Sequence, residues 1–267
     1  MYNFIDLHCH ALCEIDDGAR DQEAMFKMLD IAYLDGIRTI CFTPHFKIFW
    51  FKSDEEIAKY SEKIENSFEI ACTYVKNKYS DMELLLGNEI MYFNDIFDCL
   101  SLKKCNSLAS SSYVLVEFSP HAAYYDIKMA ISKFLRKGYR PVIAHVERYS
   151  VLTKDFSLLK ELKELGAFIQ INSTSITKFK FGKQARFIKR ALRQKLVDVV
   201  ATDSHNENSS IPSLSKAHLK VMKKHGKEYA KKIFYDNQKD ILYNTHKEFW
   251  NEFNKRNKEE INSRNRY

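Results

Sequence analysis

A recurring unit constrains the fold more than any other feature of this sequence: an amphipathic helical segment, a break, and then a short apolar run. Residues 23–35 have apolar side chains at helical spacing, Gly36 follows where a helix end favours a positive φ, and IRTICFTPH comes next. The same order recurs in ISKFLRKG-YRPVIAH, in LKELKELG-AFIQIN and, without the glycine, in IKRALRQK-LVDVVATDSH. Helices that alternate with β-branched runs predict parallel strands joined by right-handed crossovers.

Reading the whole chain in this way predicts seven strands. Seven βα units fit a closed or nearly closed α/β barrel better than an open sheet, although this preference rests on the number of units alone. No Gly/Ser or Pro linker interrupts the pattern, so we expect a single domain over residues 1–250, followed by a polar C-terminal tail over residues 251–267. The predicted strands are Phe4–Leu7, Thr39–Phe42, Glu83–Leu86, Tyr113–Val116, Pro141–Ala144, Ala167–Ile171 and Val197–Ala201.

Composition narrows the class of protein. A hydrophobic content of 45% excludes intrinsic disorder, and the net charge of +7 comes mostly from Lys and Arg interleaved with Asp and Glu, so we expect no nucleic-acid partner. The six cysteines form no CxxC pair, which suits a reducing compartment. We see no signal peptide and no apolar run long enough for a transmembrane segment, so the expected location is the cytoplasm. The sequence does not indicate an oligomeric state.

Ionisable residues follow nearly every predicted strand, at the end where α/β barrels carry their active sites. Any one of them could be a helix cap or a satisfied structural group. The two histidines of His-x-His are more telling, because side chains two apart on a strand point to the same face and can close on one ion. Hydrophobic packing gives no reason for an ionisable residue to follow nearly every strand, whereas a metal site with several ions requires it. The residues are His8, His10, His45, Glu89, Glu117, His145, Asp203 and His205, with Asn172 after the sixth strand.

These side chains offer only imidazole and carboxylate ligands, since Cys9 should point away from His8 and His10. Such a set suits Mn, Fe or Zn, and the sequence does not choose among them. Eight ligands exceed one coordination sphere, which indicates two or three ions. Ion pairs of this kind activate water and clamp a phosphoryl group in hydrolysis.

Several of these segments together resemble a known superfamily. FIDLHCHALCEIDDGA, TPHF, GNEI, LVEF, AHVERY and ATDSHN are similar to segments of the PHP (polymerase and histidinol phosphatase) superfamily, and within it to the bacterial capsule and exopolysaccharide protein-tyrosine phosphatases, the CpsB/CapC-like family. The resemblance covers about residues 1–245. It implies a distorted (β/α)7 TIM-like barrel and a metal-dependent phosphatase in which activated water attacks phosphotyrosine. It also implies a partner, a membrane-associated bacterial tyrosine kinase.

The same resemblance implies a cofactor and site residues. The cofactor is three divalent metal ions, most often Mn2+. Arg148, Asp203 and His145 would be catalytic, with Arg148 facing the phosphate. One ligand is added to the series found at the strand ends, Asp17 in the IDDG loop. The implied metal ligands are His8, His10, Asp17, His45, Glu89, Glu117, His145, Asp203 and His205.

The chain departs from the family pattern at loop positions. Cys13 and Glu14 stand where members commonly have Pro-Gly, and Val146 stands where they have Pro. Ser210 lies at the place of a second phosphate-binding Arg, which would weaken phosphate binding unless another cation compensates. The candidates for that role are Lys183, Arg186 and Lys216.

Five other interpretations compete with this one. The first alternative is a PHP-type phosphoesterase that acts on a small phosphate monoester such as histidinol phosphate, and a more distant one is an amidohydrolase-like enzyme. A metal-free regulatory scaffold should have lost ligands, and nucleic-acid processing has only the positive charge in its favour. Thiol-based phosphatases need an Arg six residues after the Cys, and the nearest match is Cys41 with Lys47.

An aromatic segment, HFKIFWFK, follows the second predicted strand. One interpretation is a lid that packs over the core. The other is a pocket wall in which Phe49, Trp50 and Phe51 bind the substrate's phenyl ring, because the segment directly follows a predicted metal ligand.

Overall fold

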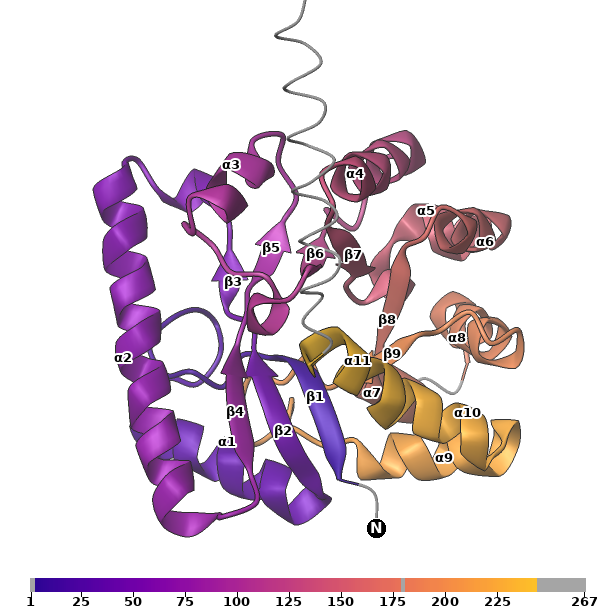
Figure 1. Cartoon of the computed structure of the whole chain (residues 1–267). Coiled ribbons are helices and arrows are strands. Elements are labelled where there is room, and N and C mark those ends of the chain that lie inside the picture. The colour runs from indigo at the N-terminus through magenta and orange to yellow at the C-terminus, as the bar shows by residue number, and fades with distance from the viewer. Residues whose placement is uncertain (1–2, 179–180, 244–267) are drawn as a thin grey trace, which may run out of the picture.

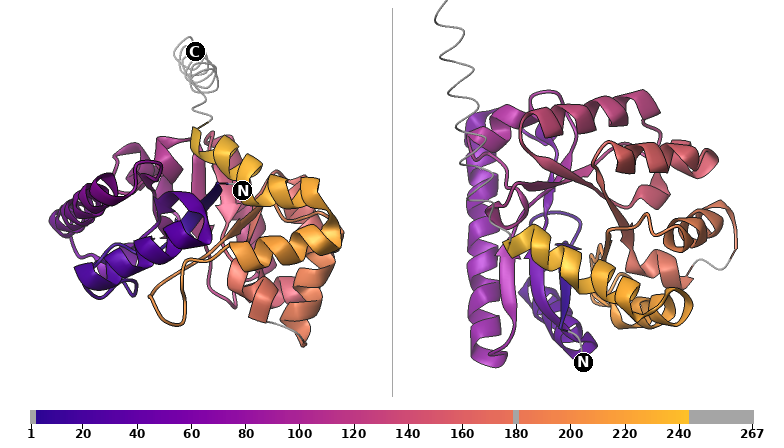
Figure 2. Two further views of the ribbon diagram at one scale, coloured as in Figure 1. Left: turned by 90° about the horizontal axis from the view of Figure 1, so that it is seen from below. Right: turned by 45° about the vertical axis from the view of Figure 1, so that its right-hand side comes forward.

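The computed structural model describes residues 3–178 and 181–243, so the predicted tail over 251–267 and the last residues of the predicted domain lie outside the described residues. Parallel strands run through the middle of the molecule and helices pack around them (Figure 1). The two further views place α1 and α2 on one side and α9 to α11 on the other (Figure 2). The strands are β1 (Phe4–Cys9), β2 (Ile37–Phe42), β3 (His45–Phe46), β4 (Glu83–Leu86), β5 (Glu89–Met91), β6 (Tyr113–Glu117), β7 (Arg140–Ile143), β8 (Phe168–Asn172) and β9 (Val199–Ala201).

The helices occupy the connections between strands, as the recurring sequence unit predicts. The α-helices are α1 (Gln22–Asp35), α2 (Asp54–Lys78), α3 (Ile96–Ser101), α4 (Tyr124–Arg136), α5 (Ser150–Lys154), α6 (Ser157–Glu164), α7 (Ser173–Lys178), α8 (Lys183–Arg193), α9 (Ser215–His225), α10 (Lys227–Lys231) and α11 (Asn237–Tyr243). The described residues also form three short 3₁₀ turns, η1 (Ile48–Trp50), η2 (Leu108–Ser110) and η3 (Val146–Arg148), and a π-helical turn, η4 (Lys232–Asp236). None of the described helices is both long and apolar enough to cross a bilayer.

Every strand pairing between the named strands is parallel, and the strands form two sheets. One sheet has the order β1-β2-β4, and the other, a curled half-barrel, has the order β3-β5-β6-β7-β8-β9. All seven predicted strands have a counterpart. The two strands that the sequence did not predict, β3 and β5, contain only two and three residues.

Glycine and proline explain where strands and helices end. Gly36 ends α1 with φ of 95° and donates its N–H to carbonyls of the last turn, as the sequence predicts. Pro44, which has no N–H to donate, separates β2 from β3. Gly87 separates β4 from β5, and a Cβ atom there would lie 3.2 Å from the Cα atom of Leu108, so a larger residue would require η2 to move slightly away.

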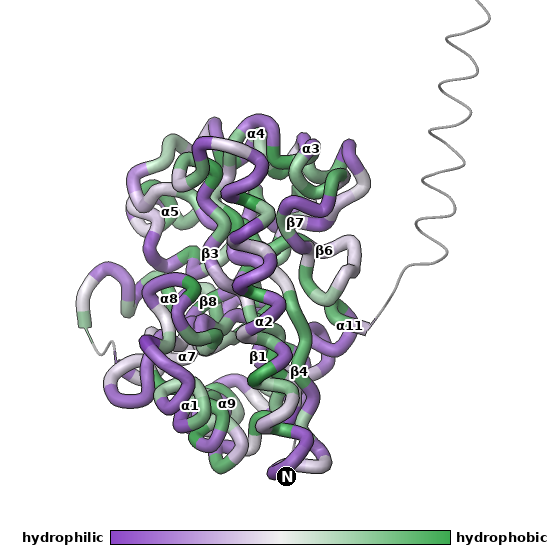
Figure 3. The backbone as a smooth tube through the Cα atoms, turned by 90° about the vertical axis from the view of Figure 1, so that its left-hand side faces the viewer, coloured by the Kyte–Doolittle hydropathy of each residue, from purple (hydrophilic) through white to green (hydrophobic). Residues whose placement is uncertain are grey.

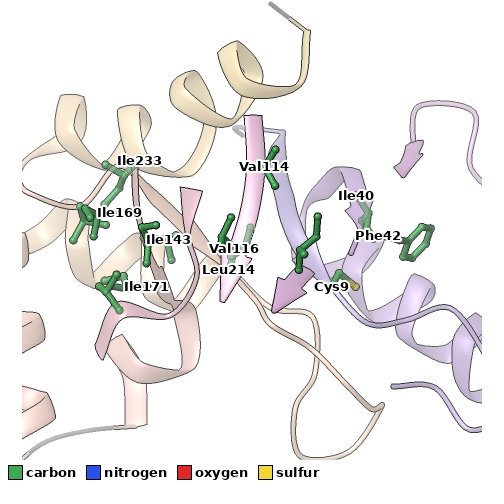
Figure 4. Packing of buried hydrophobic residues seen from close by; sticks show 14 of the residues in the cluster. Cys9, Ile40, Phe42, Val114, Val116, Ile143, Ile169, Ile171, Leu214 and Ile233 are labelled. Atoms are coloured by element: carbon green, nitrogen blue, oxygen red, sulfur yellow. The ribbon is translucent and has the colours of Figure 1, made fainter. Parts of the chain in front are cut away.

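Most strands are buried on both faces, as is typical of parallel sheets. Along β6, Val114 and Val116 pack in the larger hydrophobic cluster, whereas Tyr113 and Leu115 pack in a second cluster that Ile241 and Leu242 of α11 also join. Figure 4 shows part of the larger cluster, with Ile143, Ile169 and Ile233 close together. The strands are coloured mainly as hydrophobic and the outer helices carry the hydrophilic positions (Figure 3). The two clusters bury the apolar residues of the strands, whereas buried polar residues gather at the carboxyl ends of the strands.

Candidate metal centre

The structure brings the predicted ionisable residues together at the carboxyl ends of the strands. Three overlapping groups have donor atoms that all lie within 4.8 Å of one another. Each group combines imidazole with carboxylate, the set that suits Mn, Fe or Zn. The groups are His8, His10, Glu89 and Asp203; His10, Asp17, His45 and His205; and His45, Glu89 and Glu117.

The first group has the spacing of a coordination sphere. The Nε2 atoms of His8 and His10 lie 3.2 Å apart, and each lies 3.3 Å from Oε2 of Glu89. Oδ1 of Asp203 lies 3.3 Å from the first of these nitrogens and 3.6 Å from the second. Four atoms at tetrahedral corners about 2.1 Å from one ion would be about 3.4 Å apart. The residues therefore fit a divalent metal ion.

The pairing of β1 is irregular beside His8, the first histidine of the centre. The register of β1 against β2 shifts between Asp6 and Cys9, and such bulges re-aim side chains near active sites. Cys9 points away from the two histidines, as predicted, and its Sγ lies 3.2 Å from Oγ of Ser204. Burial raises the pKa of this thiol, so Cys9 is no thiolate ligand.

Glu89 connects the first group to the other side of the centre. Its Oε1 lies 2.8 Å from Nε2 of His145, while its Oε2 lies 3.0 Å from Nδ1 of His45 and faces the first group. Oε2 of Glu117 lies 3.9 Å from Nε2 of His145, and Oε1 of the same residue lies 3.2 Å from Nδ1 of His45. A carboxylate with one oxygen on each side is the arrangement that a bridging ligand requires.

Three of the histidines are oriented by hydrogen bonds at Nδ1. With the proton on Nδ1, His8 donates to Gln170 (3.3 Å), His10 donates to Asp16 (2.8 Å), and His205 donates to the backbone oxygen of Asp203 (2.9 Å). Each of these bonds leaves the Nε2 lone pair free to face the carboxylates. Metal-binding histidines are held in the same way, by a carboxylate, amide or carbonyl acceptor behind the ring.

Buried polar atoms without hydrogen bonds mark the same place. Among the described residues, these atoms include Oε2 of Glu89, Oε1 of Glu117, and Nδ1 of His45 and of His145. A buried carboxylate oxygen without a hydrogen-bond donor is costly unless a cation neutralises its charge. These four atoms favour bound metal ions over a purely structural role.

The site holds its carboxylates ionised. Burial alone would raise the pKa of Asp203, but the charges of His8 and Arg148 bring it down to about 2. Burial opposes ionisation of Glu89 as well, yet His8 and the other surrounding imidazoles hold its pKa well below the usual range. Burial would lower the pKa of His45, but the neighbouring carboxylates of Glu117 and Glu89 raise it to about 9. A divalent ion would therefore compete with protons on the imidazoles and not on the carboxylates.

Two residues of the centre adopt a left-handed backbone. His145 has φ of 32° and Asp203 has φ of 52°, which costs roughly 1–3 kcal/mol for a residue other than glycine. The N–H of His145 donates to Oε1 of Gln170 (2.6 Å), and the N–H of Asp203 donates to the carbonyl of His8 (2.8 Å). Strain held by such bonds is typical of functional sites.

The IDDG loop places two carboxylates at the centre. Asp16, which sequence reasoning missed, is the buried one, and its Oδ2 also accepts the N–H of His45 (2.9 Å). Asp17, the residue predicted as a ligand, is more exposed, but its Oδ1 lies 3.5 Å from Nε2 of both His45 and His205. A Cβ atom on Gly18 would lie 1.7 Å from the backbone oxygen of His10, so the loop can approach β1 only with glycine.

Arg148 lies at the rim of the centre. Its Nη2 lies 2.5 Å from Oδ2 of Asp203, and 47% of its side chain is exposed. Asn172 donates to the same oxygen (2.7 Å), and its own N–H donates to the buried Glu147 (3.0 Å), a second residue that sequence reasoning missed. Asp203 therefore directs one oxygen to the histidines and the other to the arginine.

The positions named as departures have different surroundings. Oγ of Ser210 donates to the backbone oxygen of Asp203 (3.1 Å), so this residue orders the loop after β9. Lys183 and Arg186 line a separate cleft on α8. On the other side of the centre, Nζ of Lys47 lies 3.6 Å from Oε1 of Glu117.

The aromatic segment divides between core and surface. Phe51 packs against Phe46 and Tyr60, with ring centroids 5.5 and 5.2 Å away. The Trp50 ring is edge-on to His45 at 6.1 Å and is 43% exposed, whereas Phe49 is 71% exposed. Of the three predicted substrate-binding residues, Trp50 is the one in ring contact with a residue of the centre.

Parallel strands whose carboxyl ends carry buried imidazoles and carboxylates are typical of metal-dependent hydrolases. Comparison with known proteins narrows this class. Residues 4–243 match the family model described as capsular polysaccharide synthesis, CpsB/CapC, and the chain belongs to this family.

Named relatives and a solved structure agree. The chain is 37% identical over 238 residues to the tyrosine-protein phosphatase CpsB of Streptococcus pneumoniae, which covers 87% of this chain and 96% of that protein. It is 34% identical to the tyrosine-protein phosphatase YwqE of Bacillus subtilis, over 76% of this chain and 77% of that protein. A crystal structure from work on these two proteins, described as unique metal-dependent tyrosine phosphatases, superposes with a TM-score of 0.78 over 90% of this chain and 95% of the other, at 28% identity.

Proposed function

We propose that this chain is a metal-dependent protein-tyrosine phosphatase that hydrolyses phosphotyrosine in proteins. The observation that carries the proposal is the buried centre of imidazoles and carboxylates, in which two carboxylate oxygens have no hydrogen bond. The chain that holds it is 37% identical to a named tyrosine-protein phosphatase. The family name places this activity in capsular polysaccharide synthesis. The partner is a tyrosine phosphoprotein, and we propose a membrane-associated tyrosine kinase of capsule or exopolysaccharide synthesis. The six free cysteines are consistent with action in the reducing cytoplasm.

The nine predicted ligands would hold three divalent ions, with Mn2+ as our first choice and Fe or Zn as alternatives. His8, His10 and Asp203 would hold the first ion together with Glu89, which reaches across to the second. Glu117 and His145 would complete the second site, and Asp17, His45 and His205 would supply the third. Such ions supply activation of water and neutralisation of developing charge in phosphoryl transfer.

The chain's own residues orient the phosphoryl group. Arg148 is always charged, because burial lowers its pKa less than the charges of Asp203 and Glu147 raise it. Its planar guanidinium can keep the bond to Asp203 and offer a second N–H to a phosphate oxygen. Asp203 would have two roles: one oxygen would bind metal beside His8, and the other accepts a hydrogen bond from Arg148 and so orients the guanidinium. Asn172 donates to that second oxygen and holds the carboxylate in place. His145 would take part in catalysis as a ligand of the second ion.

We interpret the strands of the single domain as a distorted barrel of seven. The N–H of Gly87 donates to the carbonyl of Phe42 (2.8 Å), which supports treating β2 with β3, and β4 with β5, as two interrupted strands. The N–H of His10 donates to the carbonyl of Ser204 (2.9 Å), which supports contact between β1 and the segment after β9.

Exhaustive chelation should lower turnover of a phosphotyrosine peptide by at least about a hundredfold, because the proposed mechanism relies on bound ions to activate water. Adding Mn2+ back should restore the rate, whereas a mock-dialysed sample should lose nothing. The measurement is kcat/KM on the peptide beside the metal content of each sample. Undiminished turnover by the metal-depleted protein would contradict the proposed function.

Truncation of Trp50 tests whether the substrate is an aryl ester or a small alkyl phosphate. If Trp50 contacts the substrate ring, Trp50→Ala should weaken turnover of aryl phosphates by about 1–3 kcal/mol in kcat/KM and leave a short alkyl phosphate nearly unchanged. Phe51→Ala is the matched control, because Phe51 packs on Phe46 and should lower the melting temperature and affect both esters alike. Equal losses on both esters in the Trp50 variant would favour the lid interpretation.

A further inference from the structure

A strongly basic cleft of about 800 Å³ lies between α5, α8 and α9. Seven of its eleven lining residues are Lys or Arg, and none of the described lining residues is Asp or Glu. None of them belongs to the metal centre. We call this cleft the basic groove, and the cations used in the argument are Lys154, Lys183, Arg186, Arg190, Arg193 and Lys224.

The fold does not require this concentration of charge. The buried face of α8 consists of apolar residues such as Ala185, Ile188 and Leu192, and the opposite face carries the cations. Arg186, Arg190 and Arg193 are three and four residues apart, a spacing at which like charges repel along a helix. Neither α8 nor α9 contains an Asp or Glu, whereas α2 mixes both signs along its length. A bound anion would relieve the repulsion on α8.

The floor of the groove is apolar and fixed. The rings of Phe156 and Phe187 meet edge to face at 5.5 Å, and both side chains are buried. The guanidinium of Arg190 lies 4.1 Å from the centre of the Phe156 ring. Nearby, hydrogen bonds from Ser157 and the charge of Arg190 lower the pKa of Asp155, whose carboxylate is thus already engaged. The other cations of the groove are exposed residues.

The groove adjoins the turn that carries Arg148. Helix α5 follows η3 directly, and Nε2 of Gln184 on α8 donates to the backbone oxygen of Glu147 in η3 (3.3 Å). The five residues of α5 cover about 8 Å at 1.5 Å per residue, a distance that three or so residues of extended peptide can span. One peptide could therefore contact Arg148 and the basic groove together.

We propose that the basic groove binds an acidic segment of the phosphoprotein substrate, close in sequence to the phosphotyrosine. This inference rests on the proposed function, and it adds that the basic groove selects which phosphoproteins the enzyme acts on. An acidic peptide fits better than a nucleic acid, because single-stranded nucleic acids stack their bases on exposed aromatic rings and the two rings here are buried. The groove would raise affinity for acidic substrates without changing the chemical step.

The test uses the variant Arg186→Gln/Arg190→Gln/Arg193→Gln, which removes three charges and keeps good helix formers. With a phosphotyrosine peptide flanked by Glu, KM should rise about tenfold, on the scale of several rim charges, while kcat stays the same. KM for the same peptide with neutral flanks and turnover of phenyl phosphate should not change. Lys59→Gln/Lys63→Gln/Lys76→Gln on exposed positions of α2, across the molecule in Figure 1, removes the same charge and should change nothing.

A binding measurement separates this inference from the proposed function. Fluorescence anisotropy of a Glu-rich peptide without phosphotyrosine should show binding to the wild-type chain, lost in the α8 variant and weakened when salt rises from about 0.05 to about 0.5 M. This result does not require turnover, so an inactive wild-type protein would overturn the proposed function alone. Equal KM and equal peptide binding in the two proteins would overturn the groove proposal. Tighter α8-dependent binding of a single-stranded DNA oligonucleotide than of the peptide would replace it with a nucleic-acid site.

Discussion

Replacing Glu89 by Gln should reduce phosphatase activity by at least about a hundredfold, because groups that merely support metal ligands already contribute 10–100-fold and Glu89 would bind two ions in the proposed centre. One of its oxygens faces His8 and His10 at 3.3 Å, and the other faces His145 at 2.8 Å. An amide keeps the shape but has one neutral oxygen and an NH2 group that cannot bind a cation. The variant should also bind less metal.

Metal content and kcat/KM on an aryl phosphate, measured on the same samples, check this result. Glu62→Gln, at an exposed position of α2, is the matched control and should leave both quantities unchanged. Far-ultraviolet circular dichroism of the metal-free proteins shows whether the Glu89 variant has kept its fold. A folded Glu89 variant with full metal content and full turnover would contradict the assignment of Glu89 as a bridging ligand.

The strands and the centre could be predicted because they depend on sequence patterns that repeat. Each apolar run after a helical segment became a strand, and parallel strands bring their carboxyl ends to one edge, so His8, Glu89 and Asp203 had to meet although they are far apart in the chain. The short strands β3 and β5 escaped prediction because two or three residues carry no periodicity.

The supporting residues could not be predicted, because their roles depend on side-chain direction. Gln170 in the apolar run FIQIN was the one detectable signal, a polar residue at a buried strand position, and its amide oxygen accepts the N–H of His145. Nothing in IDDG indicates that Asp16 lies behind His10 while Asp17 faces His45, since the close approach of Gly18 to β1 decides it. Likewise, nothing in HFKIFWFK indicates that Phe51 packs against Phe46 while Phe49 lies exposed.

Changing Arg148 to Lys should lower kcat/KM by about tenfold or more, about 1.4 kcal/mol per decade, without changing metal content. The guanidinium is a planar fork, and one of its nitrogens already donates to Asp203. A lysine ammonium is a single point charge, so it can keep the contact with Asp203 or meet a phosphate oxygen, but it cannot reproduce both in a fixed geometry. The loss should appear with phosphotyrosine peptides and with phenyl phosphate alike, because the phosphoryl group is common to both.

Arg136→Lys at an exposed position of α4 is the matched control and should leave kcat/KM unchanged. The melting temperature of Arg148→Lys should stay near the wild-type value, because nearly half of the Arg148 side chain is exposed and surface ion pairs contribute about 0–1 kcal/mol to folding. If the variant binds metal normally and keeps its full rate, another cation orients the phosphate. Lys47, on the opposite side of the centre beside Glu117, would then be the residue to replace next.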